Sequence, residues 1–395
     1  MVFITVRQSP FYHQMSLEEY LFQNFESPVL INENTANTRT YQCRAVSPKF
    51  LDKVNVEGLI AKLKKFNDST AELRKENRES LYTTFYIPKK SGGLRKINAP
   101  KPDLMDALRR LKRIFEDDFH ALYHTSAFAY IKDRCTVDAV KRHQSNESRW
   151  FGKLDLHDFF GSTTLSFVLD MFSMIFPFSE VVKRQDGKVA LETALELAFL
   201  DGGLPQGTPI SPTITNIMMI PIDFELNKSF RILIVAEPNH TTDGGNCANT
   251  TTQAFVYTRY ADDFIISSKY HFDIKKVEEN VVRVLNKYHA PFSINTKKTR
   301  YGSSAGSNWN LGVMLNKDNE ITVGHKKKKR FQAMLYNYVT DKRNGVSWSK
   351  EDLMTLHGLY SYYKMVEGDV IDAIVKHMNE KLDVDVIALI KGDLR

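Results

Sequence analysis

Two adjacent carboxylates, Asp262 and Asp263, have residue types and a spacing that could do chemistry. They lie within Phe255–Ser268, FVYTRYADDFIISS, where runs of β-formers flank them on both sides. This pattern predicts two strands joined by a tight turn that carries both acids. Adjacent anions repel each other, and a hard divalent cation bound through oxygen ligands would offset that repulsion. A solvated turn is an equal alternative for this stretch alone, because Asp is a common turn residue.

A second acidic feature precedes this stretch, in WFGKLDLHDFFGSTT over residues 150–164. Its first half predicts a strand that ends at Asp155, with Asp158 three residues later and the aromatic pair Phe159 and Phe160 beside it. Further on, residues 202–212 read GGLPQGTPISP and precede a predicted helix. A Gly/Pro-rich loop before a helix can bring backbone N–H groups close to a ligand.

Basic residues gather in two places. The sequence predicts a strand over 82–87 and a hairpin over 88–97 with its turn at Gly92-Gly93. Such a cationic ribbon is either a solvated surface or a clamp on phosphates. A second basic run opens a predicted C-terminal helix and has the same two interpretations. The residues concerned are Lys89, Lys90, Arg95 and Lys96 in the hairpin, and Lys326 to Arg330 in the helix.

The elements that must position these residues alternate between helices and strands. Apolar spacing predicts helices over 56–66, 103–119, 191–200, 272–288, 353–365 and 370–382, and from residue 325. The formal net charge of +7 permits a polyanionic partner. Three widely spaced cysteines without a CxxC pair argue against a zinc ribbon and fit a reducing cytoplasm. No apolar run is long enough to cross a bilayer, so we expect no membrane partner and a cytoplasmic location.

In chain order, these features resemble the reverse transcriptase family from about Leu81 to about Asp369. The family's fingers segment is similar to YIPKKSGGLRKINAP, its first palm motif to LDLHDFF, and its loop and helix under the templating base pair to LPQGTPISPTITN. Its signature hairpin matches YADD, its lysine motif resembles INTKKT, and its primer-side motif resembles NLGV. A lone YADD is weak evidence, whereas these motifs together in one chain are highly specific.

The resemblance implies an α+β fold of the right-hand polymerase type. We expect fingers, a palm built from an antiparallel sheet backed by helices, and a helical thumb. The expected divisions are an N-terminal accessory region over 1–80, fingers over 81–150, a palm over 151–322, and a thumb with the C-terminal tail over 323–395. The palm would include helical elements over 165–205 and an inserted loop over 228–254.

The resemblance also implies an enzyme, an RNA-directed DNA polymerase that joins dNTPs with two Mg²⁺ ions, for which Mn²⁺ could substitute. Asp155 and Asp262 would be the principal metal ligands, and Asp263 would adjust the ion on the primer side. The Leu156 carbonyl would also reach a metal. We expect Asp158 to make a structural hydrogen bond rather than to bind metal.

Other residues are assigned by the same resemblance. Phe160 matches the family's steric gate against a 2′-hydroxyl, with an ordinary core Phe as the alternative. Lys298 could protonate the departing pyrophosphate; Lys297 competes for that role, and a plain surface lysine is the third interpretation. The residues implied to contact the nucleotide are Lys89, Lys90, Arg95, Phe160 and Gln206. Those implied to contact the primer–template are Lys326, Lys327, Lys328, Lys329, Arg330, Leu311 and Gly312.

Within the family, YADD, KKSGGLR and HGLYSYYKMVEGD resemble prokaryotic retron-like enzymes. Two elements of retron enzymes differ here. In place of Asn-Ala-x-x-His the chain has Asp138-Ala139, with His143 one residue out of register. In place of Val-Thr-Gly it has Thr322-Val323-Gly324. We therefore expect a bacterial reverse transcriptase of an unclassified group that acts in antiphage defence and copies a structured noncoding RNA encoded nearby.

Three other functions stay open. One is template-independent or protein-primed DNA synthesis of the abortive-infection type, and another is an RNA-binding, maturase-like protein that no longer polymerises. Intact Asp155, Asp262 and Asp263 argue against the latter. The third, RNA-dependent RNA synthesis, is disfavoured by Phe160 and by YADD. A protein partner or a homo-oligomer is also open.

Overall fold

The structure is a computed structural model and describes residues 3–7, 12–16, 55–89, 92–117, 123–232, 255–304 and 312–395. Lys90 and Leu311, both expected to contact ligands, lie outside these ranges, as does most of the expected accessory region. The first strands, β1 (Phe3–Arg7) and β2 (Tyr12–Ser16), pair as an antiparallel hairpin. No helix in the described ranges is long and apolar enough to span a membrane.

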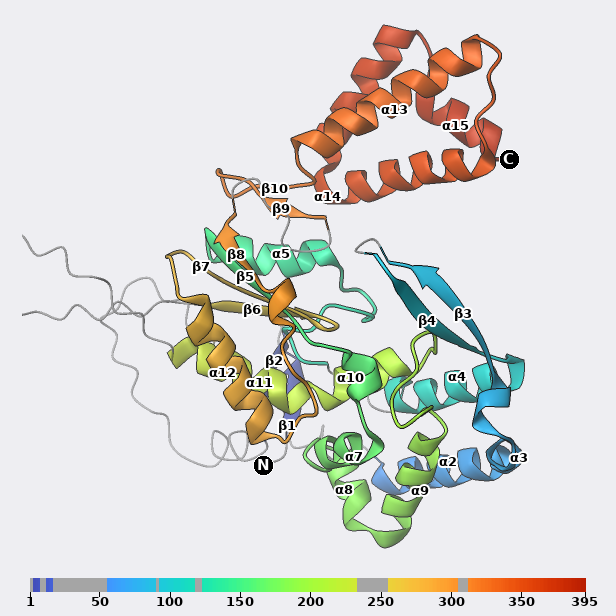
Figure 1. Cartoon of the computed structure of the whole chain (residues 1–395), viewed down its shortest axis with the longest axis vertical. Coiled ribbons are helices and arrows are strands. Elements are labelled where there is room, and N and C mark those ends of the chain that lie inside the picture. Colours follow the sequence, from blue (N-terminus) through green and yellow to red (C-terminus); the bar gives the residue numbers. More distant parts are fainter. Residues whose placement is uncertain are drawn as a thin grey trace, which may run out of the picture.

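A four-stranded antiparallel sheet lies at the centre of the molecule (Figure 1). Its strand order is β6–β7–β5–β8, so the two strands of the predicted acidic hairpin sit beside the strand that ends at Asp155. The strands are β5 (Trp150–Asp155), β6 (Val256–Tyr260), β7 (Asp263–Ser268) and β8 (Arg300–Ser303).

Side chains alternate between the two faces of this sheet, as the period of a strand requires. Leu154, Phe264 and Ile266 pack into the larger core together with α11 (Ile220–Ile232) and α12 (Ile274–Lys287). Phe151 and Ile265 belong instead to a second core, shared with α5 (Thr136–Ser145) and the C-terminal helices. Because both faces are covered there, β5 and β7 are almost entirely buried, which fixes their register.

Helices on the larger core form the base of the molecule. They are α2 (Val56–Ser69), α3 (Ala71–Lys75), α4 (Pro102–Asp117), α6 (Phe159–Ser162), α7 (Leu165–Ser173), α8 (Phe178–Lys183), α9 (Gln185–Glu196) and α10 (Ser211–Met218). Two 3₁₀ turns, η2 (Arg78–Leu81) and η3 (Thr296–Lys298), connect elements. As predicted, Leu104, Leu108, Leu111 and Phe115 form the fully buried face of α4.

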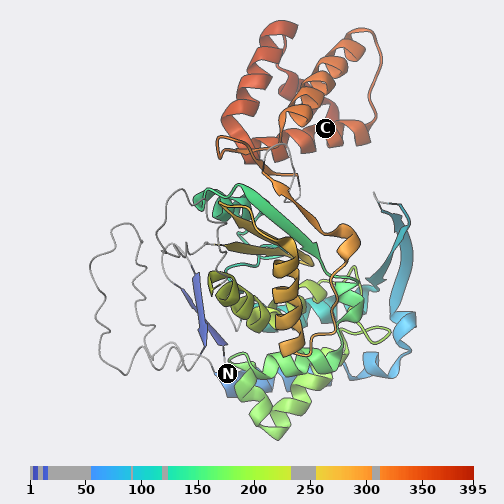
Figure 2. The same ribbon diagram turned by 60° about the vertical axis from the view of Figure 1, so that its left-hand side comes forward.

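Two parts extend from this body. The hairpin of β3 (Tyr82–Pro88) and β4 (Leu94–Pro100) projects at one side, and no other strand in the described ranges pairs with it (Figures 1 and 2). The C-terminal helices lie above the sheet and are joined to it through the short pair β9 (Met314–Leu315) and β10 (Ile321–Thr322). These helices are α13 (His325–Arg343), α14 (Lys350–Leu382) and α15 (Val386–Leu394).

Two sequence expectations need correction. The inserted loop expected over 228–254 is helical at its start, because α11 continues to Ile232; Phe230 of that helix is fully buried. The two C-terminal helices expected over 353–365 and 370–382 are confirmed as the two arms of α14, which the non-helical backbone at Glu367 separates. The final helix α15 was not predicted, although Val386 and Ile390 bury its apolar face.

Candidate active site

The predicted acidic turn is a two-residue connection between β6 and β7. Tyr260 pairs with Asp263, which leaves Ala261 and Asp262 as the turn. Ala261 has a left-handed φ of 57°, a conformation that a residue with a side chain rarely adopts. The backbone N–H of Leu156 donates a 3.1 Å hydrogen bond to the Asp262 carbonyl. The turn is therefore fastened to the end of β5.

Strand register brings the third carboxylate to the same place. Asp155 is the last residue of β5 and lies directly opposite Asp263 of β7. Directly paired residues in an antiparallel ladder project from the same face of the sheet. Asp155 is buried, with 6% of its surface exposed. The structure thus brings together the three aspartates that the sequence predicts, from two segments about a hundred residues apart in the chain.

Two lysines neutralise part of this negative charge. The Lys298 ammonium lies 2.9 and 3.1 Å from the two carboxylate oxygens of Asp155. The Lys153 ammonium lies 2.5 Å from Asp263 Oδ2. Lys298 was predicted from the lysine motif, whereas Lys153 was not. Lys153 lies two residues before Asp155 on the same face of β5, so strand period is the signal that could have identified it.

Burial and the remaining negative charge shift the pKa values of Asp262 and Asp263. Burial, followed by the charge of Asp263, raises the pKa of Asp262 to about 6. Burial also raises the pKa of Asp263, although the Lys153 ammonium opposes that rise. The hydrogen bond to Asp155 raises the pKa of Lys298, so this ammonium stays protonated at neutral pH.

The donor chemistry of the three carboxylates fits a hard divalent cation, which prefers oxygen ligands. Within the described ranges, no three His, Cys, Asp or Glu side chains approach closely enough to form a complete metal site. Lys298 and Lys153 each form an ion pair with one of the carboxylates.

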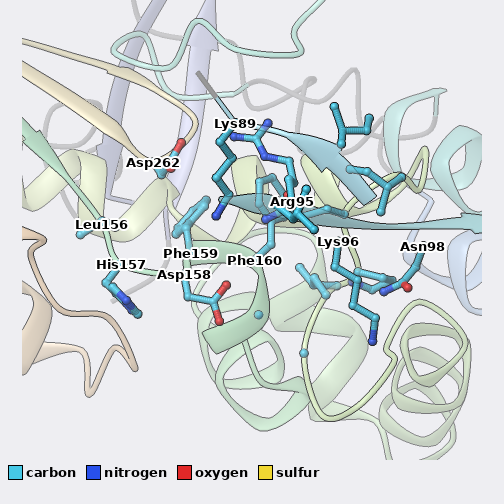
Figure 3. Close-up of a pocket in the computed structure, with 18 of the residues that line it drawn as sticks. Lys89, Arg95, Lys96, Asn98, Leu156, His157, Asp158, Phe159, Phe160 and Asp262 are labelled. Carbon is cyan, nitrogen blue, oxygen red and sulfur yellow. The ribbon is translucent and has the colours of Figure 1, made fainter. Parts of the chain in front are cut away.

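A cleft of about 1190 Å³ lies between this cluster and the β3–β4 hairpin. Figure 3 shows Asp262 on one wall and Lys89 and Arg95 on the hairpin side. Neither Lys89 nor Arg95 forms an ion pair with a described residue, whereas Lys96 lies 3.5 Å from Asp201. The predicted residues that line the cleft are Lys89, Arg95, Asp155, Leu156, Phe160, Gln206, Asp262 and Lys298.

The Gly/Pro-rich loop forms the floor between the hairpin and α6. The Asn98 N–H donates to the Gln206 carbonyl at 2.9 Å, and the Leu204 N–H donates to the Phe160 carbonyl at the same distance. A side chain at Gly203 would lie 2.2 Å from the Gly161 carbonyl oxygen, so only glycine permits this approach. The loop therefore links the hairpin to α6, and all three segments carry residues that we expect to contact the nucleotide.

The two aromatic residues after Asp155 differ in burial. Both residues line the cleft, but Phe159 is almost fully buried in the core, whereas Phe160 is half-buried. The Asp158 residue has a left-handed φ of 42° and also lines the cleft. Our expectation that Asp158 makes a structural hydrogen bond was wrong, because its exposed carboxylate has no such partner among the described residues.

The lysine run at the start of α13 is only partly free to meet a ligand. Lys327 donates to the Gly312 carbonyl at 2.8 Å, and Lys328 forms a 2.9 Å ion pair with Glu367. The Glu367 carboxylate also accepts hydrogen bonds from the backbone of Val323 and the hydroxyl of Thr322. The exposed cations of the run are Lys326, Lys329 and Arg330.

Comparison with known proteins decides the family. The family described as "Reverse transcriptase (RNA-dependent DNA polymerase)" matches residues 87–332, more than half of the 395 residues. The chain belongs to the reverse transcriptase family. It is therefore an RNA-directed DNA polymerase, and its mixed helices and sheet form the right-hand polymerase fold of that family.

Retron enzymes are among its relatives. The chain is 25% identical to the retron Ec83 reverse transcriptase of Escherichia coli over 323 residues, which are 78% of this chain and 90% of that enzyme. It is 26% identical to the retron Ec73 reverse transcriptase of Escherichia coli, over 63% of this chain and 73% of that one. Among solved structures, telomerase from Candida albicans matches with a TM-score of 0.41 and 12% identity, over 85% of this chain and 60% of that one. The relatives in sequence identify a retron-like prokaryotic reverse transcriptase.

Proposed function

We propose that this reverse transcriptase synthesises DNA at the cleft between Asp262 and the β3–β4 hairpin, by two-metal nucleotidyl transfer. The observation that carries the proposal is the convergence of carboxylates and phosphate-binding cations on one cleft. Asp155 and Asp262 line one part of it, and Lys89 and Arg95 line another. We assign residues 81–150 to the fingers, 151–322 to the palm and 323–395 to the thumb.

In this proposal the acidic residues bind the metal ions. Asp155, Asp262 and Asp263 would hold the divalent ions, with the Leu156 carbonyl as a further ligand. The chemistry that two bound Mg²⁺ ions supply is activation of the primer 3′-hydroxyl and stabilisation of the leaving pyrophosphate. Lys153 and Lys298 balance the charge of the acids while no ion is bound.

The basic residues then orient the nucleotide. Arg95 and Lys89 are exposed, without acidic partners among the described residues, so they are available to the β- and γ-phosphates of a dNTP. Lys298 is a better candidate than Lys297 for proton donor to pyrophosphate, because Lys298 lines the cleft. Phe160 restricts the space for a 2′-hydroxyl, and Gln206 lies on the loop that joins the hairpin to the gate.

We further propose that the template is a dedicated structured noncoding RNA and that the enzyme acts in bacterial antiphage defence. The support is the similarity to retron enzymes, together with the net charge of +7 that suits a polyanionic partner.

The test of the site is the Asp262→Ala/Asp263→Ala enzyme. We expect dNTP incorporation on a primed RNA template to be abolished, because the turn then offers no carboxylate to a divalent ion. RNA binding, measured by filter retention, should stay close to wild type, and calorimetry should show that the double variant is folded. Incorporation by the purified double variant at the wild-type rate would show that the assignment of the site is wrong.

A further inference from the structure

Behind the acidic turn lies a fully buried ion pair between Arg259 of β6 and Asp223 of α11. Neither side chain has any exposed surface. Arg259 Nη2 lies 2.8 Å from Asp223 Oδ2, and Arg259 Nε lies 2.9 Å from Asp223 Oδ1. The Tyr257 hydroxyl also donates a hydrogen bond, of 2.8 Å, to Asp223 Oδ1. Both oxygens of this buried carboxylate therefore accept hydrogen bonds.

The third nitrogen of Arg259 serves the turn itself. Arg259 Nη1 donates at 3.2 Å to the carbonyl oxygen of Ala261, the residue with the left-handed φ of 57°. The same nitrogen donates at 3.2 Å to Asn216 Oδ1 on α10, and Asn216 in turn donates to the Ala129 carbonyl at 2.8 Å. The guanidinium therefore joins the turn to two helices and to the segment before α5.

The two carbonyls of the turn are held from opposite sides. Arg259 donates to that of Ala261, and the backbone of Leu156 donates to that of Asp262. These contacts bracket the peptide that carries the Asp262 side chain. The hydrogen bond from Leu156 holds the turn next to β5, where Asp155 lies. The hydrogen bond from Arg259 links the turn to α11 through the ion pair with Asp223.

Stability alone gives a weak reason to bury such a pair. Removing two charges from water costs so much that apolar replacement of a buried ion pair is often neutral or stabilising. A planar guanidinium with donors in a fixed fork can, however, hold a carboxylate and a carbonyl at once. That geometry suits the orientation of a strained turn.

We propose that Arg259, held by Asp223, is a positioning residue that sets Asp262 for divalent-metal binding. The proposal rests on the proposed function of Asp262 as a metal ligand. Loss of the Arg259 donor would free the Ala261 peptide to relax from its left-handed conformation, which would move Asp262 relative to Asp155. The chain would still fold, but it would bind the divalent ions less well.

The test separates positioning from stability by removing both charges. The control is Tyr257→Phe, which deletes one hydrogen bond to Asp223 but leaves the donor to Ala261 in place. The test enzyme is Tyr257→Phe/Asp223→Leu/Arg259→Met, in which no charge or hydroxyl of the pair is left buried without a partner. Mn²⁺ binding is measured by electron paramagnetic resonance without nucleotide, and kcat and KM for dNTP are measured at several Mg²⁺ concentrations.

We expect the triple variant to bind Mn²⁺ at least about tenfold more weakly than the control and to lose about 100-fold in kcat, with a small change in KM, since a misplacement near 1 Å has that effect. Arg259→Lys is a second variant, because a lysine keeps the charge beside Asp223 but cannot hold the Ala261 carbonyl at the same time. It should show the same weakening of Mn²⁺ binding.

A folded triple variant or Arg259→Lys enzyme with the Mn²⁺ affinity and kcat of Tyr257→Phe would overturn the proposal. Asp262→Ala is measured beside them to distinguish a wrong assignment of the metal site from a wrong assignment of the positioning role. Full activity of Asp262→Ala contradicts the proposed site. If Asp262→Ala is inactive while the triple variant and Arg259→Lys keep the Mn²⁺ affinity and kcat of Tyr257→Phe, only the positioning role is contradicted.

Discussion

At the scale of single residues, Asp262 is held in the fold at an energetic cost. Burial, then the negative charges of Asp263 and Asp155, raise its pKa from 3.8 to about 6. An acid whose pKa is higher in the folded than in the unfolded chain stabilises the fold while it is protonated. That contribution is complete below about pH 4 and is lost as the pH rises through 6.

This cost predicts the effect of Asp262→Asn on stability. In metal-free buffer at pH 7, the substitution should raise the free energy of unfolding by about 1–3 kcal/mol, because it removes a buried charge. The gain should shrink to less than half near pH 4.5, where wild-type Asp262 is already protonated in the folded state. Urea unfolding at both pH values measures it, with exposed Asp158→Asn as the control. An equal gain at both pH values would contradict the link between the pKa and the stability.

Phe160 predicts the choice of sugar. Phe160→Ala should lower the preference for dNTP over NTP by about 10–200-fold, because the cleft gains room for a 2′-hydroxyl. Single-nucleotide incorporation with each substrate measures the ratio of kcat/KM values. Phe159→Leu is the matched control, since its ring lies in the core and its loss should affect stability instead. If Phe160→Ala keeps the wild-type preference, Phe160 is not the gate.

At the scale of an element, α13 divides its basic residues between two roles. Lys328 is built into the base of the C-terminal helices through Glu367, at the point where α14 is kinked. Lys326 and Lys329 are exposed and have no ion pair with a described residue. The sequence presents five equivalent cations, and packing alone distinguishes them.

The division predicts two different phenotypes. Lys326→Ala/Lys329→Ala should weaken primer–template binding and reduce the slope of log K against log salt by about 1 per lysine that contacts a phosphate, while the free energy of unfolding stays near wild type. Lys328→Ala should lower the free energy of unfolding by about 3 kcal/mol, because the buried Glu367 carboxylate would lose its cation and keep only its hydrogen bonds from Val323 and Thr322. Fluorescence anisotropy across a salt series and urea unfolding provide the two measurements.

Lys276→Ala, an exposed lysine on α12, is the control for general loss of charge. A salt slope that changes as much for Lys276→Ala as for the double variant would remove α13 from the nucleic-acid surface.

At the scale of the whole molecule, the hairpin and the C-terminal helices extend in different directions from the body that holds the sheet (Figures 1 and 2). Cations face the cleft from the hairpin and lie exposed at the start of α13. This arrangement suits a long polyanion that crosses the turn rather than a free nucleotide alone.

The proposed RNA partner gives a prediction at this scale. Purification of the enzyme from its native host, followed by sequencing of the bound nucleic acid, should yield one structured RNA together with complementary DNA. The Asp262→Ala/Asp263→Ala enzyme should retain the RNA and lack the DNA. DNA attached covalently to the protein without a matching RNA would support protein-primed synthesis instead, and RNA alone from the wild type would favour a binding protein that does not polymerise.

The sequence by itself determined the family, the strands that carry the acids and several of the residues that line the cleft. Those features are local, since YADD between two runs of β-formers specifies its own hairpin, and the strand that ends at Asp155 is readable within a few residues. The structure places Asp155 opposite Asp263 and leaves Phe160 half-buried at the cleft, whereas Phe159 is almost fully buried.

Only the tertiary structure decided how the acids are held. Asp223 lies 36 residues before Arg259, and Lys298 lies 143 residues after Asp155, and no local pattern links either pair. Burial makes these partnerships specific, because a charge removed from water must find its counterpart wherever the fold brings one. The turn of YADD was therefore predictable from its residues, whereas the buried guanidinium that fastens it was not.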